Sequence, residues 1–233
     1  PWLKEVDSLA LANAQMNLQS AYRNFFRDKS VGFPKYKSKK DNHKAYTTNN
    51  QKGSVAIVGK YIKLPKIGYV RVKQHRGFIG TIKSVTISQV PSGKYYVSIL
   101  VETEHIEFPH TDNKVGLDLG IKDLCIASNG DKFENPETLK KYEKQLVKLQ
   151  RQLAHKEKGS ANFYKIKRKI AKCHERITNI RKDNLHRISH KLINDNQLIV
   201  SENLAISNMI KNHNLAKSIA DCSWYELTRQ LEY

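Results

Sequence analysis

Two acidic residues, Asp118 and Glu202, draw attention because each interrupts or follows a short apolar segment. Asp118 lies within VGLDLGIKDL, residues 115–124, and Glu202 follows the run LIVS, residues 198–201. An ionised carboxylate among apolar side chains is costly unless a partner charge or a metal ion compensates it. If the two segments are neighbouring strands of one sheet, the carboxylates converge, and a divalent cation relieves their repulsion.

Such a pair of carboxylates suits metal-dependent hydrolysis of a phosphodiester bond. Mg²⁺ prefers hard oxygen ligands and is commonly held by one or two carboxylates together with water and substrate phosphate. In two-metal sites one ion activates the attacking water and the other stabilises the leaving oxygen. The alternative from pattern alone is that Asp118 caps a turn and that Glu202 is a surface acid at a strand end.

The charge of the chain points to a polyanionic partner. Lys and Arg number 41 against 22 Asp and Glu among 233 residues, a formal net charge of +19. An excess of this size favours nucleic acid. We do not expect a membrane partner, because the longest apolar runs, such as YYVSILV, are too short to span a bilayer. The alternative is a solvated basic surface that binds nucleic acid without chemistry.

The three cysteines, Cys125, Cys173 and Cys222, include no C-x-x-C pair, and no secretory signal opens the chain. We therefore predict a reduced setting, the cytoplasm of a bacterium or archaeon, and three buried thiols rather than a zinc site. The chain begins at Pro1 without an initiator Met and stops at Tyr233 within a helical pattern. We expect it to be a fragment of a longer protein.

Residues 1–110 are predicted to form one domain. Apolar positions on one face predict a helix over residues 7–27, and five β-rich segments with turn signals between residues 54 and 102 predict a small antiparallel barrel or sandwich. Between them, the stretch 31–44 interleaves Phe33 and Tyr36 with lysines, which suits backbone contact and base stacking, or else a solvated basic loop.

Residues 111–233 are predicted to form the second domain. VGLDL, LCIAS and the strand after the NGDKF turn predict a β-meander. Apolar residues spaced by three and four predict an antiparallel helical hairpin over about residues 137–193. Between residues 137 and 191 there are 17 Lys and Arg but only five Asp and Glu, which favours phosphate contact over an ordinary solvated surface. A short strand at 197–204 and a capping box at 223–226 follow.

Several of these stretches resemble the OrfB/TnpB family of transposon-encoded proteins. VGLDLGIKDLCIASNG, residues 115–130, resembles the first RuvC motif of that family, and LIVSENLAISNMIKNHNLAKSIADCSWYELTRQLEY, residues 198–233, resembles the second motif and the segment after it. GFPKYKSKK, residues 32–40, and the β-rich part before Val115 are also similar. The resemblance covers essentially the whole chain.

The resemblance implies an α+β or α/β architecture. It consists of a small antiparallel β-barrel with a helical insertion, followed by an incomplete RNase H-like (RuvC) domain with an inserted basic hairpin. It also implies a protein, related to the type V CRISPR effectors, that binds a guide RNA from the transposon and cuts target DNA. In that scheme base pairing reads the sequence, while the protein holds the heteroduplex through its backbone and recognises a short flanking motif.

Asp118 then matches the first catalytic aspartate and Glu202 the catalytic glutamate, both as ligands of Mg²⁺ or Mn²⁺. The family's third motif, with its catalytic aspartate, and its zinc ribbon are expected beyond Tyr233, so we expect no zinc in this chain. Asp123 and Asp221 are the nearby acids that could replace the third one. We expect neither to do so, because Asp123 resembles a turn residue and Asp221 precedes a helix start.

The expected function is thus that of a TnpB-like RNA-guided DNA endonuclease with two of three catalytic acids, which binds nucleic acid but cuts poorly or not at all by itself. The alternatives are a non-catalytic accessory or regulator of transposition and a DDE-type transposase. The residues that we expect to contact nucleic acid are Lys35, Tyr36, Lys37, Lys39, Lys40, Arg71, Lys73, Lys165, Lys167, Arg168, Lys169 and Lys211.

Overall fold

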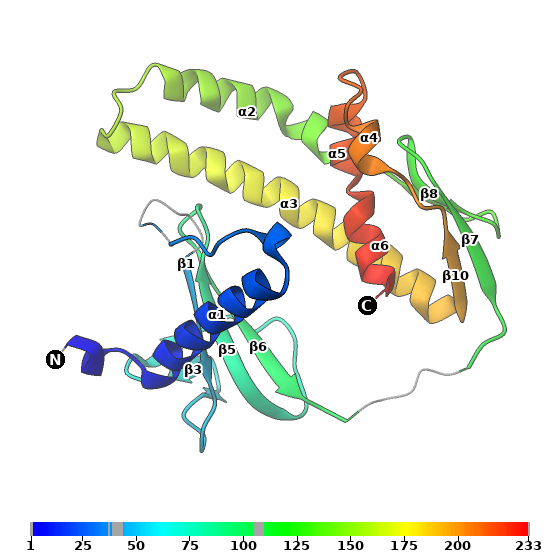
Figure 1. Cartoon of the computed structure of the whole chain (residues 1–233). Coiled ribbons are helices and arrows are strands. Elements are labelled where there is room, and N and C mark those ends of the chain that lie inside the picture. Colours follow the sequence, from blue (N-terminus) through cyan, green and yellow to red (C-terminus); the bar gives the residue numbers. More distant parts are fainter. Residues whose placement is uncertain (1, 37, 39–43, 105–109, 233) are drawn as a thin grey trace. The chain divides into compact units, whose positions relative to one another are not determined.

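The chain has an α+β arrangement in which strands β1 to β9 follow one another and most helices come before or after them (Figure 1). The computed structural model describes residues 2–36, 38, 44–104 and 110–232. The chain divides into two units, Pro1–Ile106 and Glu107–Tyr233, and the segment where one gives way to the other lies within residues 105–109, outside the described part.

The first unit contains the β-rich segments that the sequence predicted, with a further strand before them. The strands are β1 Lys44–Asn49, β2 Ala56–Val58, β3 Tyr61–Leu64, β4 Gly68–Arg71, β5 Thr81–Gln89 and β6 Tyr95–Glu102. They pair antiparallel in two three-stranded sheets, with the orders β1-β5-β6 and β2-β3-β4. The strand that sequence reasoning missed, β1, begins where the expected basic loop ends.

The expected β-barrel is not closed. Among the described residues no strand ladder joins the two sheets into one ring. Instead Val55, Ile62 and Leu64 form one buried cluster with Val85 of β5. Strands β2 to β4 are only three or four residues long, and their sheet packs on the other one through the buried side chains of β3.

The predicted helix of the first unit is α1, Ser8–Arg27, flanked by the 3₁₀ turns Trp2–Glu5 and Lys29–Val31. The carboxylate of Asp7 caps its start by accepting a hydrogen bond from the Leu9 amide at 3.2 Å, and it also accepts one from the buried Thr48 hydroxyl. Asn13 donates to the carbonyl of Thr47 at 3.2 Å. These contacts fasten α1 to β1. Within the described part of the chain, α1 comes before β1.

The second unit is built on one mixed sheet. Its strands are β7 Lys114–Leu119, β8 Asp123–Ala127, β9 Lys132–Glu134 and β10 Leu198–Ser201, in the order β10-β7-β8-β9. The meander of β7, β8 and β9 is antiparallel, as the sequence predicted, whereas β10 runs parallel to β7. Gly120 lies in the turn between β7 and β8, where a Cβ atom would come within 2.8 Å of the Asp123 carbonyl oxygen. The tight turn thus requires a glycine.

The expected helical hairpin consists of α2, Thr138–Ala154, and α3, Ala161–Asp195 (Figure 1). Its two helices share a small apolar cluster of Leu146, Cys173 and Ile177. The second half of α3 packs under the sheet, where Leu185, Ile188 and Leu192 belong to the main core of this unit. One helix therefore joins the hairpin to the sheet.

Three shorter helices complete the unit: α4 Ile206–Met209, α5 Ala216–Cys222 and α6 Trp224–Glu232. Trp224 is buried in the core and its indole N–H donates to the carbonyl of Leu124 at 3.3 Å. The predicted capping box at 223–226 does not form. The Ser223 hydroxyl donates to the Ala220 carbonyl, and the Glu226 carboxylate binds Arg229 instead.

All three cysteines are free and buried, as predicted. Burial raises the pKa of the Cys125 and Cys222 thiols to about 11, so neither is ionised near neutral pH. Within the described part of the chain, no helix has both the length and the apolar character needed to cross a bilayer.

Candidate active site and nucleic-acid interface

Asp118 and Glu202 meet at one end of the four-stranded sheet. The parallel register pairs Ser201 with Leu117. The residues that follow these two, Glu202 and Asp118, therefore lie side by side. Glu202 Oε1 accepts a hydrogen bond from the backbone N–H of Leu119 at 2.8 Å, which holds this carboxylate beside β7. Both acids line a single open depression of about 480 Å³.

The alternation of side chains along β7 explains why Asp118 faces this depression. Val115 and Leu117 are buried against the helices, whereas Asp118 is exposed on the other face of the sheet. The expectation that Asp118 lies in a buried strand is therefore wrong on this face of the sheet. Because the site is open, the carboxylates avoid the cost of burial and are accessible to a large substrate.

The donor chemistry of the depression fits a hard divalent cation. Asp118 and the second oxygen of Glu202, Oε2, are the available carboxylate oxygens, and one or two carboxylates with water and phosphate are a common Mg²⁺ environment. Among the described residues, no group of three or more His, Cys, Asp or Glu side chains is placed to hold a metal ion. The described chain thus contributes two acids to the site.

Asp221, the more buried of the two possible substitutes, has a different role. It lies in α5, and its carboxylate binds the Arg181 guanidinium at 2.7 Å and accepts the Leu139 amide hydrogen bond at 3.0 Å. It therefore ties α5 to α3 and caps α2. Asp123, at the start of β8, does not line the depression either.

In the first unit, the predicted contact residues Lys35 and Tyr36 are exposed, whereas Lys37, Lys39 and Lys40 lie outside the described residues. The Tyr36 ring is fully exposed. Phe33, in contrast, packs edge-on against Tyr22 and Phe25 of α1, with ring centroids 5.6 and 5.4 Å apart. Of the two aromatic residues in this stretch, Tyr36 therefore has the more exposed ring.

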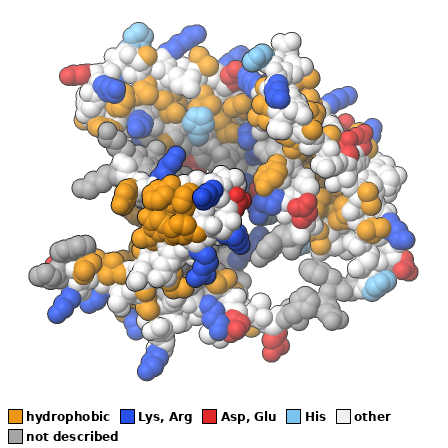
Figure 2. All heavy atoms as spheres, in the orientation of Figure 1, with side chains coloured by type: hydrophobic (Ala, Val, Ile, Leu, Met, Phe, Trp, Pro, Cys, Tyr) orange, Lys and Arg blue, Asp and Glu red, His pale blue; other side chains and the backbone are white. Residues whose placement is uncertain are grey.

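The aromatic cluster of Tyr22, Phe25, Phe26 and Phe33 was not expected from the sequence. Phe26 and Phe33 remain 72% and 59% exposed. Figure 2 shows hydrophobic side chains gathered over the end of α1 and the segment after it, with Lys and Arg side chains beside them. Tyr22 and Phe25 are half-buried, so the cluster lies partly at the surface.

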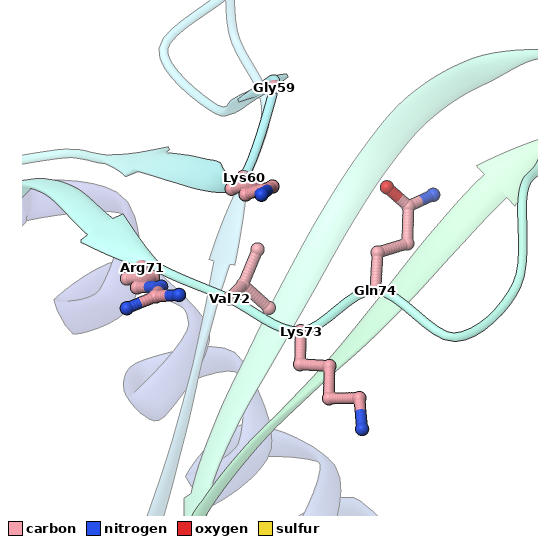
Figure 3. A pocket seen from close by; sticks show the side chains of 6 residues that line it. All are labelled: Gly59, Lys60, Arg71, Val72, Lys73 and Gln74. Carbon is pink, nitrogen blue, oxygen red and sulfur yellow. The ribbon is translucent and has the colours of Figure 1, made fainter.

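Arg71 and Lys73 line a pocket of about 700 Å³ at the end of the β3–β4 hairpin (Figure 3). Lys60, just before β3, lies in the same pocket. The backbone N–H of Val72, just after β4, donates a hydrogen bond to the Lys60 carbonyl at 2.9 Å. The structure therefore gathers three cations from two segments of the hairpin.

Lys165, Lys167, Arg168 and Lys169 are all exposed near the start of α3, but only Lys169 lines the groove between α2 and α3. Lys211 follows α4 and donates to the Asn208 side chain at 3.0 Å. Sequence reasoning missed the other cations of the groove, Lys148, Lys172 and Arg176. The spacing of three and four from Lys169 to Lys172 and Arg176 along α3 was the signal that could have identified two of them.

Comparison with known proteins identifies relatives over the whole chain. The family model OrfB_IS605, described as "Probable transposase", matches residues 98–213, which include both Asp118 and Glu202. "Putative RNA-guided DNA endonuclease InsQ" of Escherichia coli K12 is 38% identical, and the alignment covers 100% of this chain and 61% of that protein. A "Putative RNA-guided DNA endonuclease" of Streptomyces pristinaespiralis is 36% identical over 100% of this chain and 58% of its own length. The chain thus spans about three fifths of these relatives.

Proposed function

This chain belongs to the OrfB/TnpB family of transposon-encoded proteins, and we propose that it is part of an RNA-guided DNA endonuclease with Asp118 and Glu202 as catalytic acids. The observation that carries the proposal is the meeting of these two carboxylates at the ends of parallel β7 and β10. The names of the relatives support a guide RNA and a target DNA as partners.

The proposed cofactor is Mg²⁺ or Mn²⁺, held by Asp118 and Glu202 Oε2. When bound, a pair of such ions supplies activation of water and stabilisation of the leaving oxygen. The chain's own contribution is to orient these ligands: the Leu119 amide fixes the Glu202 carboxylate, and the open face of the sheet admits a phosphodiester backbone. We propose that residues 111–233 are part of an RNase H-like domain.

We assign a nucleic-acid-binding role to residues 1–110. The cations Lys35, Arg71 and Lys73 and the exposed ring of Tyr36 support this role, since lysine and arginine bind phosphates and an exposed ring stacks on bases. The second unit adds Lys165, Lys167, Arg168, Lys169 and Lys211. We propose that the cations bind the nucleic-acid backbone and that Tyr36 stacks on bases, so that none of them reads the sequence.

We also propose that this chain by itself binds nucleic acid but cuts DNA poorly or not at all. The reason is that no third metal-binding side chain joins Asp118 and Glu202 among the described residues. We propose no zinc site among the described residues, where the three cysteines are free and buried and no group of three or more His, Cys, Asp or Glu side chains could hold a metal ion.

The test is to purify the chain from cells that carry its gene and its flanking DNA, and to sequence the RNA that copurifies. We expect one discrete RNA. We also expect the chain to bind matching double-stranded DNA, to lose this binding after ribonuclease treatment, and to cleave little DNA with Mg²⁺. DNA binding that survives ribonuclease would refute RNA guidance and favour a DDE-type transposase or a DNA-binding regulator. Efficient cleavage by this chain would refute the proposed deficiency.

A further inference from the structure

The two helices of the α2–α3 hairpin enclose a groove of about 590 Å³. Lys148 and Gln145 of α2 line one side, and Lys169, Lys172 and Arg176 of α3 line the other. We infer that this groove binds the sugar-phosphate backbone of an RNA strand. This inference adds a binding site to the proposed function. It rests on that function only where it identifies the RNA as the guide.

The groove is positively charged. Four cations line the groove, and none of its lining residues is acidic. Lys169, Lys172 and Arg176 are separated by three and four residues, so they form a row along one face of α3. Like charges at this spacing repel each other, and phosphates would relieve that repulsion.

Three acids of the hairpin pair with cations that lie outside the groove. Glu137 pairs with Lys140, Glu143 with Lys217, and Asp183 with Arg187. Within the described part of the chain, no ion pair is formed by Lys148, Lys169 or Lys172. The positive charge of these three groove lysines is therefore not neutralised by the acids of the hairpin.

Parts of the groove are ordered before any ligand binds. The guanidinium of Arg176 lies over the Tyr142 ring, 5.4 Å from its centroid, which restrains a long side chain before any ligand arrives. The floor is fixed by the buried cluster of Leu146, Cys173 and Ile177 that joins the two helices. A groove that is already ordered loses less entropy on binding than a flexible basic loop.

RNA is favoured over other polyanions by the uncharged polar groups in the groove. The side-chain amides of Gln145 and Gln152 lie among the cations. An amide can both donate to and accept from a ribose 2′-hydroxyl, the group that distinguishes RNA from DNA. Acidic peptides offer carboxylates but no equivalent hydroxyl beside each charge.

The test uses fluorescence anisotropy with a labelled oligouridine of about 20 nucleotides and the matching oligothymidine, over a series of KCl concentrations. The groove variant is Lys148→Gln/Lys169→Gln/Lys172→Gln. The control, Lys144→Gln/Arg151→Gln/Lys158→Gln, removes the same charge at exposed positions of the hairpin that do not line the groove. Circular dichroism and thermal unfolding check that both variants fold.

For the groove variant we expect RNA binding at least about tenfold weaker at 0.1 M salt and a log–log salt slope smaller by about two, since each lost single-strand phosphate contact removes about 0.7. The control variant should change affinity less than about twofold. In a second pair of measurements, Gln145→Leu/Gln152→Leu should lose more affinity for oligouridine than for oligothymidine.

Equal losses in the groove and control variants would overturn the inference, because they would show a diffuse effect of charge. Unchanged RNA binding by the groove variant, together with lost binding of an oligoglutamate peptide, would assign the groove to an acidic protein segment instead. Because oligouridine is no guide, these results are independent of whether a discrete RNA copurifies with the chain. Failure of the proposed function can thus be told from failure of this inference.

Discussion

At the scale of single residues, Asp118 shows how far a local pattern can be interpreted. The run VGLDL predicts a strand correctly, but three apolar residues around an acid do not reveal whether one or both faces are covered. The structure buries Val115 and Leu117 and leaves Asp118 exposed. Its nearness to Glu202 depends on the parallel pairing of β7 with β10 across the whole hairpin, which no local spacing encodes.

A substitution of Asp221 tests whether this residue has a structural role or binds a metal ion. Asp221→Asn removes the charge that binds Arg181 and weakens the cap on Leu139. We expect the free energy of unfolding to fall by about 2 kcal/mol, as for a largely buried charged hydrogen bond. Urea denaturation measures this loss, and the exposed Asp112→Asn serves as the control. A variant of normal stability that had lost Mn²⁺ binding would instead make Asp221 a ligand.

Glu226 gives a prediction on pH dependence. Hydrogen bonds from Arg229 lower the pKa of its carboxyl from 4.5 to about 2. Because the pKa is lower in the folded state, the stabilisation is present in full above about pH 4.5 and disappears as the pH falls toward 2. Glu226→Gln should therefore lower the melting temperature slightly at pH 7, and this difference should shrink below about pH 4.5. A difference that grew on acidification would contradict the assignment.

At the scale of elements, the helical hairpin was predictable and the arrangement of the first unit was not. The spacing of apolar residues by three and four is local, so it predicted α2 and α3 with their turn. Closure of a barrel depends on pairing between distant strands, and the short β2, β3 and β4 form their own sheet. The strand β1 was missed because KAYTTN follows a basic stretch and has few apolar residues.

The long helix α3 links the hairpin to the sheet, and its anchor is testable. Leu185 is 1% exposed in the core beneath β7 and β8, whereas Ile180, five residues earlier, is at the surface. Leu185→Ala should reduce the free energy of unfolding by about 3 kcal/mol, because it leaves a cavity. Ile180→Ala should cost less than half of that in the same urea titration. Equal costs would mean that α3 is not anchored through this face.

At the scale of the whole molecule, composition and motif similarity predicted more than the spacing of individual residues did. The net charge of +19 favoured a polyanion, and similarity over the whole chain placed it in its family. The sequence could not show which cations share a surface. The structure gathers Lys60, Arg71 and Lys73 in one pocket, and separately Lys148, Lys169 and Lys172 in one groove.

The central claim is that Asp118 and Glu202 together form a metal site. Titration of Mn²⁺ followed by electron paramagnetic resonance tests it directly in this chain, with Asp118→Asn, Glu202→Gln and the exposed control Asp112→Asn compared with the unaltered protein. We predict weak binding of Mn²⁺ that is lost in Asp118→Asn, reduced at least about tenfold in Glu202→Gln and unchanged in the control. Mn²⁺ binding that is the same in all four proteins, or absent from the unaltered chain, would contradict the account.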